Sequence, residues 1–160
     1  MMKRILALLE NDSRLTPAEL SVMTGLDETA IRKQIRTWEK DGTIVGYQTK
    51  IDWDRTEAEN VSALIELKVV PQQDRGFDEI ASRICRFPEV ESAWLMSGGF
   101  DIAVLVSGKT MREVALFVAE KLSLMENITA TATHFVLRRY KDNGLVFGKP
   151  EKDEREAGEY

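Results

Sequence analysis

The sequence predicts an α+β chain, in which a helical N-terminal third is followed by strands and helices in the order β-α-β-β-α-β. Two observations support this prediction. Early apolar residues recur every three or four positions, as on amphipathic helices, whereas several later segments alternate apolar and polar residues, as half-buried strands do. The 160 residues, 43% of them hydrophobic and 31% charged, suffice for two small globular domains.

Two short helices joined by a glycine turn are predicted in the N-terminal third, with one helix before them. The first of the two starts at Thr16 and Pro17, and Glu19 completes a capping box with Thr16. Gly25 supplies the turn, because glycine adopts left-handed backbone conformations at little cost, and Asp27 caps the next helix. This pattern is typical of a helix-turn-helix. The apolar residues expected to pattern the three helices and their turn are Ile5, Leu8 and Leu9, then Leu20 and Met23 with Val22 alongside, and then Leu26, Ile31, Ile35 and Trp38.

After the stop signal at Gly42, alternating side chains over residues 44–51 predict a strand, which we interpret as a β-hairpin wing or a hinge strand. The polar stretch that follows has little apolar patterning and is the best candidate for a linker. The expected division is a winged helix-turn-helix domain in residues 1–50, a linker in 51–60, a second domain in 61–142 and a charged tail in 143–160.

The second domain has the element order of the ferredoxin-like fold, in which four antiparallel strands carry both helices on one face. Strands are expected over residues 61–69, 91–97, 101–107 and 128–140. The expected inward faces of the helices are Phe77, Ile80, Ala81 and Ile84, then Met111, Val114, Ala115, Val118 and Leu122 after a cap at Thr110 with Glu113. Such a sheet leaves its other face uncovered, so we expect a second copy of the chain to bury it.

Composition argues against several classes of protein. The single cysteine, Cys85, cannot form an internal disulfide, and its position after an apolar helix face predicts a small buried hydrophobe. Cys85 and His134 alone cannot form a zinc site, and the sequence shows no nucleotide-binding glycine motif, so we expect no metal, cofactor or catalytic residue. No apolar run approaches the roughly 20 residues of a membrane span, and no export signal is visible. A soluble, cytoplasmic protein without a membrane partner is therefore expected.

The charge distribution points to a nucleic-acid partner. The net charge of −5 argues against one at first, because lysine and arginine contacts to phosphates supply most non-specific affinity. Residues 29–40, however, hold four basic side chains and one acidic one. The second helix of a helix-turn-helix enters the major groove, so we expect its exposed face to contact double-stranded DNA, with a dimer reading two half-sites. The candidate residues are Thr29, Arg32, Lys33, Arg36 and Lys40; a merely solvated helix face is the alternative.

A glycine-containing loop between two predicted strands is the second candidate site. Over residues 97–101 it reads Ser-Gly-Gly-Phe-Asp. One interpretation is a hairpin turn with an aspartate at a strand edge. The other is a loop whose bare backbone N–H groups meet the carboxylate of a small ligand, while Asp101 meets an ammonium group or orders the loop.

Several short motifs are similar, in order and spacing, to those of the Lrp/AsnC family of leucine-responsive, or feast/famine, regulators. The resemblance covers about residues 3–142. Its motifs are Ile5-Leu6, Arg14, Thr16, Glu19-Leu20, Gly25-Leu26, Ala30-Ile31, Gly42 to Tyr47, the Gly-x-x-Asp loop from Gly98 to Asp101, and Thr133 to Leu137. Gln34 stands where a second arginine is common in the family, and Ser97 and Phe100 replace its common threonine and tyrosine.

The resemblance implies a sequence-specific transcription regulator whose DNA binding or assembly responds to a small metabolite such as an amino acid. It also implies a RAM-type second domain, dimers formed through the sheets, and further assembly into tetramers or octamers. Amino acids bind near the Gly-x-x-Asp loop, where dimers meet. The effector-binding residues implied here are Ser97, Gly98, Gly99, Phe100, Asp101 and Thr133.

Two other functions stay open from the sequence. Sirohaem decarboxylases resemble the same two-domain architecture and depend on histidine and basic residues in the second domain. The only histidine here is His134, which its strand context predicts to be structural or interfacial. An interaction module whose basic helix does not touch DNA is the other alternative, and salt-dependent DNA binding would exclude it.

Overall fold

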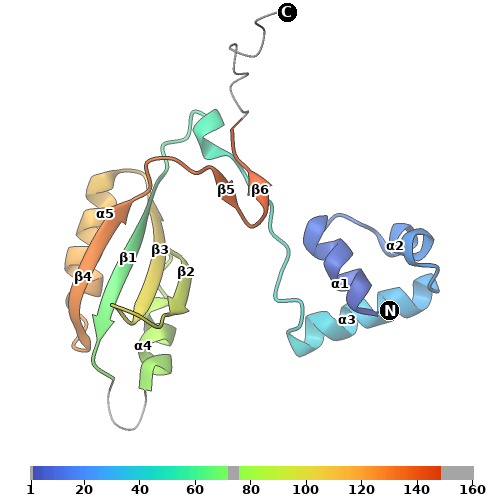
Figure 1. Ribbon diagram of the computed structural model, residues 1–160, viewed down its shortest axis with the longest axis horizontal. Helices are drawn as coiled ribbons and strands as arrows, with labels where there is room; N and C mark the ends of the chain where they lie inside the picture. Colours follow the sequence, from blue (N-terminus) through green and yellow to red (C-terminus); the bar gives the residue numbers. More distant parts are fainter. Residues whose placement is uncertain (1, 72–75, 149–160) are drawn as a thin grey trace, which may run out of the picture. The chain divides into compact units, whose positions relative to one another are not determined.

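The computed structural model describes residues 2–71 and 76–148, which form two compact units that meet in sequence between Ile51 and Asp52 (Figure 1). We call the part up to Ile51 the helical unit and the part from Asp52 the sheet unit. Each is described by itself. Within the described residues, none of the helices has the length and apolar character needed to cross a bilayer.

The helical unit consists of α1 (Met2–Asn11), α2 (Pro17–Thr24) and α3 (Glu28–Asp41) (Figure 1). The apolar spacing of α1 and α3 directs one face of each helix inward, as the sequence predicts. Of the apolar residues named for α2, only Leu20 is buried, whereas Val22 is 87% and Met23 46% exposed. The buried core is Ile5, Leu9, Leu20, Ile31 and Trp38, and the side chains packed against it include Leu8, Leu26, Ile35 and Ile44. The helix-turn-helix thus has a small hydrophobic core of its own.

The strand expected over residues 44–51 is wrong. Residues 45–52 form neither helix nor strand, and no described strand pairs with them. The segment is held to α3 instead: the backbone N–H of Ile44 donates to the carbonyl of Trp38 at 2.9 Å, and the Tyr47 hydroxyl donates to Glu39 Oε1 at 3.0 Å. Alternating side chains alone do not make a strand, because its backbone groups need a neighbouring strand to pair with.

The sheet unit has four antiparallel strands: β1 (Val61–Val69), β2 (Val90–Leu95), β3 (Ile102–Gly108) and β4 (Ile128–Phe135). Their order across the sheet is β2-β3-β1-β4, which confirms the predicted ferredoxin-like arrangement (Figure 1). The helices are α4 (Gly76–Ile84) and α5 (Met111–Phe117), and α5 continues as the π-helical turn η2 (Val118–Leu122). Three short elements are η1 (Trp53–Arg55), β5 (Lys141–Asp142) and β6 (Leu145–Val146).

Both helices pack on one face of the sheet, as predicted. Alternate residues of β1 are buried together with side chains of α4, α5 and η2 in one cluster. The expected inward stripe of the second helix is wrong in part: Met111 is 53% exposed and Ala115 is exposed, whereas Phe117 is 5% exposed. The buried positions Val114, Phe117 and Val118 follow the i, i+3, i+4 spacing of a helix face, whereas Ala115 lies about 100° around the axis from Val114. Met111 shares the spacing of this face but is the first residue of α5 and stays exposed.

Two further expectations need correction. The last long strand ends at Phe135 rather than at residue 140, because its partner β1 begins at Val61; the final bond of this pairing joins the Val136 N–H to the Ser62 carbonyl. Cys85 is exposed, not buried. It follows Ile84, which faces the sheet, and one residue further along a helix lies about 100° around its axis.

Candidate DNA interface and effector loop

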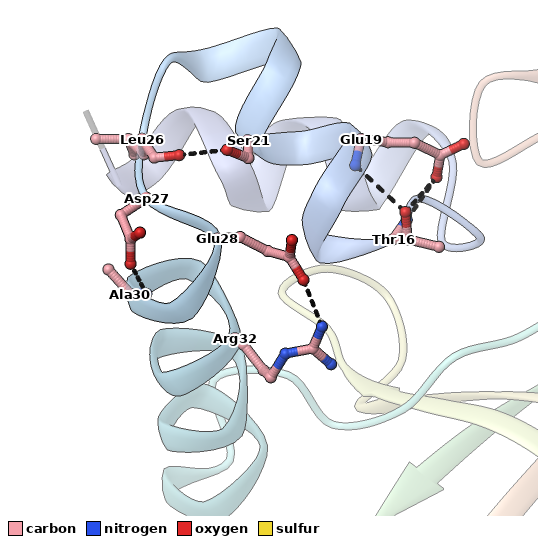
Figure 2. Close-up of polar contacts among 8 residues, drawn as sticks. All are labelled: Thr16, Glu19, Ser21, Leu26, Asp27, Glu28, Ala30 and Arg32. Carbon is pink, nitrogen blue, oxygen red and sulfur yellow. Dashed lines mark hydrogen bonds and ion pairs between the residues drawn. The ribbon is translucent and has the colours of Figure 1, made fainter.

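The start of α2 is fixed by two reciprocal hydrogen bonds. The Thr16 hydroxyl accepts from the Glu19 N–H at 3.3 Å, and the Glu19 carboxylate accepts from the Thr16 N–H at 2.7 Å (Figure 2). This confirms the predicted capping box. The Thr16 hydroxyl also donates to Glu19 Oε2 at 2.8 Å. The two bonds that the carboxylate accepts, from the Thr16 N–H and from the Thr16 hydroxyl, lower the pKa of the Glu19 carboxyl.

The turn between α2 and α3 sets where the second helix starts. Gly25 has φ 71°, the left-handed region, and its N–H donates to the Ser21 carbonyl at 2.8 Å. The Ser21 hydroxyl then donates to the carbonyl of Leu26 at 2.6 Å, and Asp27 caps α3 by accepting from the Ala30 N–H at 2.8 Å (Figure 2). These bonds hold the turn at Gly25, Leu26 and Asp27, so α3 starts from a defined position.

Helix α3 separates packing from exposure. Ile31 is fully buried and Trp38 is 8% exposed, whereas all five predicted DNA-contacting residues are exposed. These five lie along one side of the helix, because Arg32 and Lys33 follow Thr29 by three and four residues, Arg36 follows them by four and three, and Lys40 follows Arg36 by four. The structure brings the five together on one surface, and their contact with DNA stays a prediction.

One acidic side chain beside this surface, Glu28, escaped the sequence analysis, which counted only Glu39. Arg32 Nη2 donates to Glu28 Oε1 at 2.6 Å, and both side chains keep about half their exposure, 51% and 45% (Figure 2). Glu39 Oε1 accepts a hydrogen bond from the Tyr47 hydroxyl. Burial and this bond raise the pKa of Tyr47. The spacing of four residues from Glu28 to Arg32 was the available signal for the ion pair.

The predicted effector loop connects β2 to β3, and Asp101 ties it to β1. Asp101 Oδ2 accepts from the Val69 N–H at 2.7 Å, the Asp101 N–H donates to the Leu67 carbonyl at 2.9 Å, and the Met96 N–H donates to the Asp101 carbonyl at 2.8 Å. Asp101 therefore orders the loop. Gly98 has φ 151°, where side-chain-bearing residues are rarely found, and Ser97, Gly98 and Gly99 are exposed.

Thr133 is not brought beside this loop. It is exposed on β4, where it is paired with Ile65, whereas the loop bonds to β1 at Leu67 and Val69 on the opposite side of that strand. Two strand spacings and several residues of register imply a separation on the order of 10 Å or more. One chain therefore does not gather all six implied effector residues.

The sheet face opposite the helices carries the only histidine. His134 is paired across the strands with Leu64, and His134 Nε2 lies 3.4 Å from Glu66 Oε1. Leu64 and Leu105 are paired and half-buried, and Trp94 is 49% exposed. We call this surface the open face; its members include Ser62, Leu64, Glu66, Trp94, Ala103, Leu105, Ala132 and His134. No group of side chains able to hold a metal ion occurs among the described residues.

Comparisons with known proteins agree with both parts of this structure. Residues 2–45 match the family model described as a winged helix-turn-helix DNA-binding domain, and residues 62–146 match the Lrp/AsnC ligand binding domain. A helix-turn-helix joined to a ligand-binding domain defines the class, a ligand-responsive DNA-binding transcription regulator. The chain belongs to the Lrp/AsnC family, so the predicted resemblance is confirmed.

Individual relatives cover nearly the whole chain. The uncharacterized HTH-type transcriptional regulator YugG of Bacillus subtilis (strain 168) is 41% identical over 152 residues, which are 94% of this chain and 92% of that protein. The leucine response regulatory protein of Mycobacterium tuberculosis shares the fold with a TM-score of 0.73 at 21% identity, covering 89% of this chain and 94% of that one. A regulator from Neisseria meningitidis, solved as an L-Met complex, has a TM-score of 0.67 at 21% identity, covering 84% and 86%.

Proposed function

We propose that this transcription regulator binds double-stranded operator DNA through the exposed face of α3, and that a bound amino acid changes its assembly or its DNA affinity. The division of α3 into a buried side, with Ile31 and Trp38, and an exposed cationic side supports the DNA contact most directly. Thr29, Arg32 and Lys33 are nearest the helix N-terminus and are assigned to base edges or nearby phosphates, and Arg36 and Lys40 to the DNA backbone.

A mobility-shift assay on the DNA upstream of the chain's own gene tests this assignment. Replacing Arg32 and Lys33 together by alanine should weaken binding by more than about tenfold, because each phosphate or base contact contributes to affinity. The matched control replaces Arg83 and Arg86, exposed at the end of α4 and just after it, which removes the same charge from the sheet unit. Full retention of binding in the α3 variant would contradict the assignment.

For the effector we infer an amino acid bound at the loop from Ser97 to Asp101. The exposed backbone of Gly98 and Gly99 offers N–H groups to a carboxylate, and the L-Met complex of the Neisseria regulator shows that a protein of this fold binds an amino acid. Thr133 lies apart from the loop, so we propose that a second copy of the chain completes the site. Calorimetry against all twenty amino acids, followed by mass measurement with any that bind, tests site and assembly together.

Assembly through the open face is also proposed. Leu64, Leu105 and Trp94 place apolar surface on the side of the sheet that no helix of the described residues covers, and burying such a patch favours association. A dimer, assembling further to tetramers or octamers, places two recognition helices for two half-sites.

We propose no catalytic role and a cytoplasmic location, where operator DNA is found. The enzyme alternative is sirohaem decarboxylation, which would need histidine. His134 lies beside Glu66 on the open face, the surface proposed here for association with a second copy, which favours an interfacial role for this histidine. Incubating the protein with sirohaem and following carboxyl loss tests this alternative directly; turnover would overturn the regulator-only assignment.

A further inference from the structure

We propose that Glu28 is a positioning residue for DNA recognition: it holds the guanidinium of Arg32 ready for a base edge and disfavours DNA that lacks the matching base. The inference rests on the proposed contact between α3 and DNA and adds a specificity-determining residue to it. Glu28 is the first residue of α3, at the end of the recognition helix that meets base edges in helix-turn-helix proteins.

The geometry joins two side chains one helical turn apart on the exposed face. Arg32 Nη2 donates to Glu28 Oε1 at 2.6 Å (Figure 2). A guanidinium has five N–H donors, so this bond leaves most of them for DNA. Since the two side chains are 51% and 45% exposed while paired, the guanidinium can reach a base edge without leaving Glu28.

The backbone under Glu28 is held in place on both sides. Asp27, just before it, caps α3 through its bond from the Ala30 N–H, and Ile31, three residues on, is fully buried in the core. Glu28 therefore cannot move away from the groove independently of α3. With the backbone of Glu28 fixed, its bond with Arg32 limits the rotamers of Arg32, which reduces the entropy lost when Arg32 binds a base.

The charge of the pair decides which DNA it favours. A free arginine binds any phosphate, but Glu28 offsets that charge and is itself repelled by phosphates, so attraction to arbitrary DNA falls. At a guanine, Arg32 can donate to O6 and N7 together, and a nearby cytosine can donate its N4 amino group to Glu28. The pair therefore favours DNA with a G·C base pair at this position. It does so by lowering the affinity for DNA with other bases there as much as by raising the affinity for the matching site.

Two duplexes measure this discrimination: one selected by the wild-type full chain from a random pool, and one with the same bases shuffled. Glu28→Gln should bind the shuffled duplex more tightly and the selected duplex less tightly. The ratio of the two Kd values should then fall about tenfold, the usual size of one bidentate base contact. Glu10→Gln on α1 removes the same charge from the same unit and should leave the ratio unchanged.

A double variant separates a true coupling from a general charge effect. With Arg32→Ala in the background, Glu28→Gln should no longer change the ratio, because the partner that Glu28 positions is gone. Glu28→Asp keeps the charge but shortens the arm, and should fall between the wild type and Glu28→Gln. An unchanged ratio in Glu28→Gln, or the same fall with and without Arg32, overturns the inference. The proposed DNA contact itself fails separately, if Arg32→Ala alone leaves binding to the selected duplex unchanged.

Discussion

At the scale of single residues, Gly25 shows how one backbone angle supports the DNA-binding unit. Its φ of 71° is left-handed, and a Cβ added there would meet nothing within 4 Å. Gly25→Ala should therefore destabilise the helical unit through backbone strain alone, by about 1 kcal/mol. Gly46→Ala is the matched control, since Gly46 lies in the same unit with equally open space and no positive φ. Thermal melts followed by far-ultraviolet circular dichroism measure both; equal shifts would mean that the left-handed turn does not matter.

A second residue-scale prediction concerns acid. Because its bonds from Thr16 lower the pKa of Glu19 below 4.5, the carboxylate contributes stability above that pH and loses it as the pH falls through the folded pKa. Replacing Glu19 by Gln should therefore flatten the pH dependence of the melting temperature below about pH 4.5. Melts across that range, compared with Glu10→Gln, measure the difference, and an unaltered pH profile in Glu19→Gln would refute the role of the capping box.

At the scale of elements, α5 shows where the buried stripe lies. Phe117 is 5% exposed and stacks edge-to-face on Phe87, with ring centroids 5.4 Å apart, whereas Met111 is 53% exposed. Phe117→Ala should cost about 3 kcal/mol or more in the free energy of unfolding, because it leaves a cavity beneath the helix. Met111→Ala should cost about 0.5 kcal/mol or less. Urea denaturation of both variants measures these free energies. A larger loss for Met111→Ala than for Phe117→Ala would show that Met111 belongs to the buried face, as the sequence predicted.

Elements that short sequence patterns specify were predictable from the sequence. Features that depend on residues far apart in the sequence, such as strand pairing, were not. The Thr16 capping box, the Gly25 turn and the alternation along β1 are short-range patterns, and the structure shows each of them. The segment after Gly42 alternates in the same way but has no described strand beside it, so alternation misled. At the candidate site, charge spacing predicted the exposed face of α3, but the pairing of Arg32 with Glu28 and the distance of Thr133 from the loop depend on side-chain and sheet geometry.

At the scale of the whole molecule, the proposed function depends on a second copy. The open face bears Leu64 and Leu105 side by side, and Trp94 is 49% exposed on the same surface. An operator with two half-sites is bound tightly only when two recognition helices are joined, because the second contact then becomes intramolecular. DNA affinity should therefore fall whenever this face is disrupted, even though no DNA-contacting residue changes.

Trp94→Glu tests this dependence, because it places a charge on the open face without removing a fully buried side chain. Light scattering at micromolar concentration should show the mass fall to that of one chain, since an unpaired charge buried in an interface is strongly unfavourable. In the same variant, binding to the selected duplex should weaken by tenfold or more, on the order of the loss expected when bivalency disappears. Leu124→Glu, at a position 73% exposed after η2, provides the control and should keep both mass and affinity. A Trp94→Glu protein that retains its wild-type mass would show that copies of the chain associate through another surface.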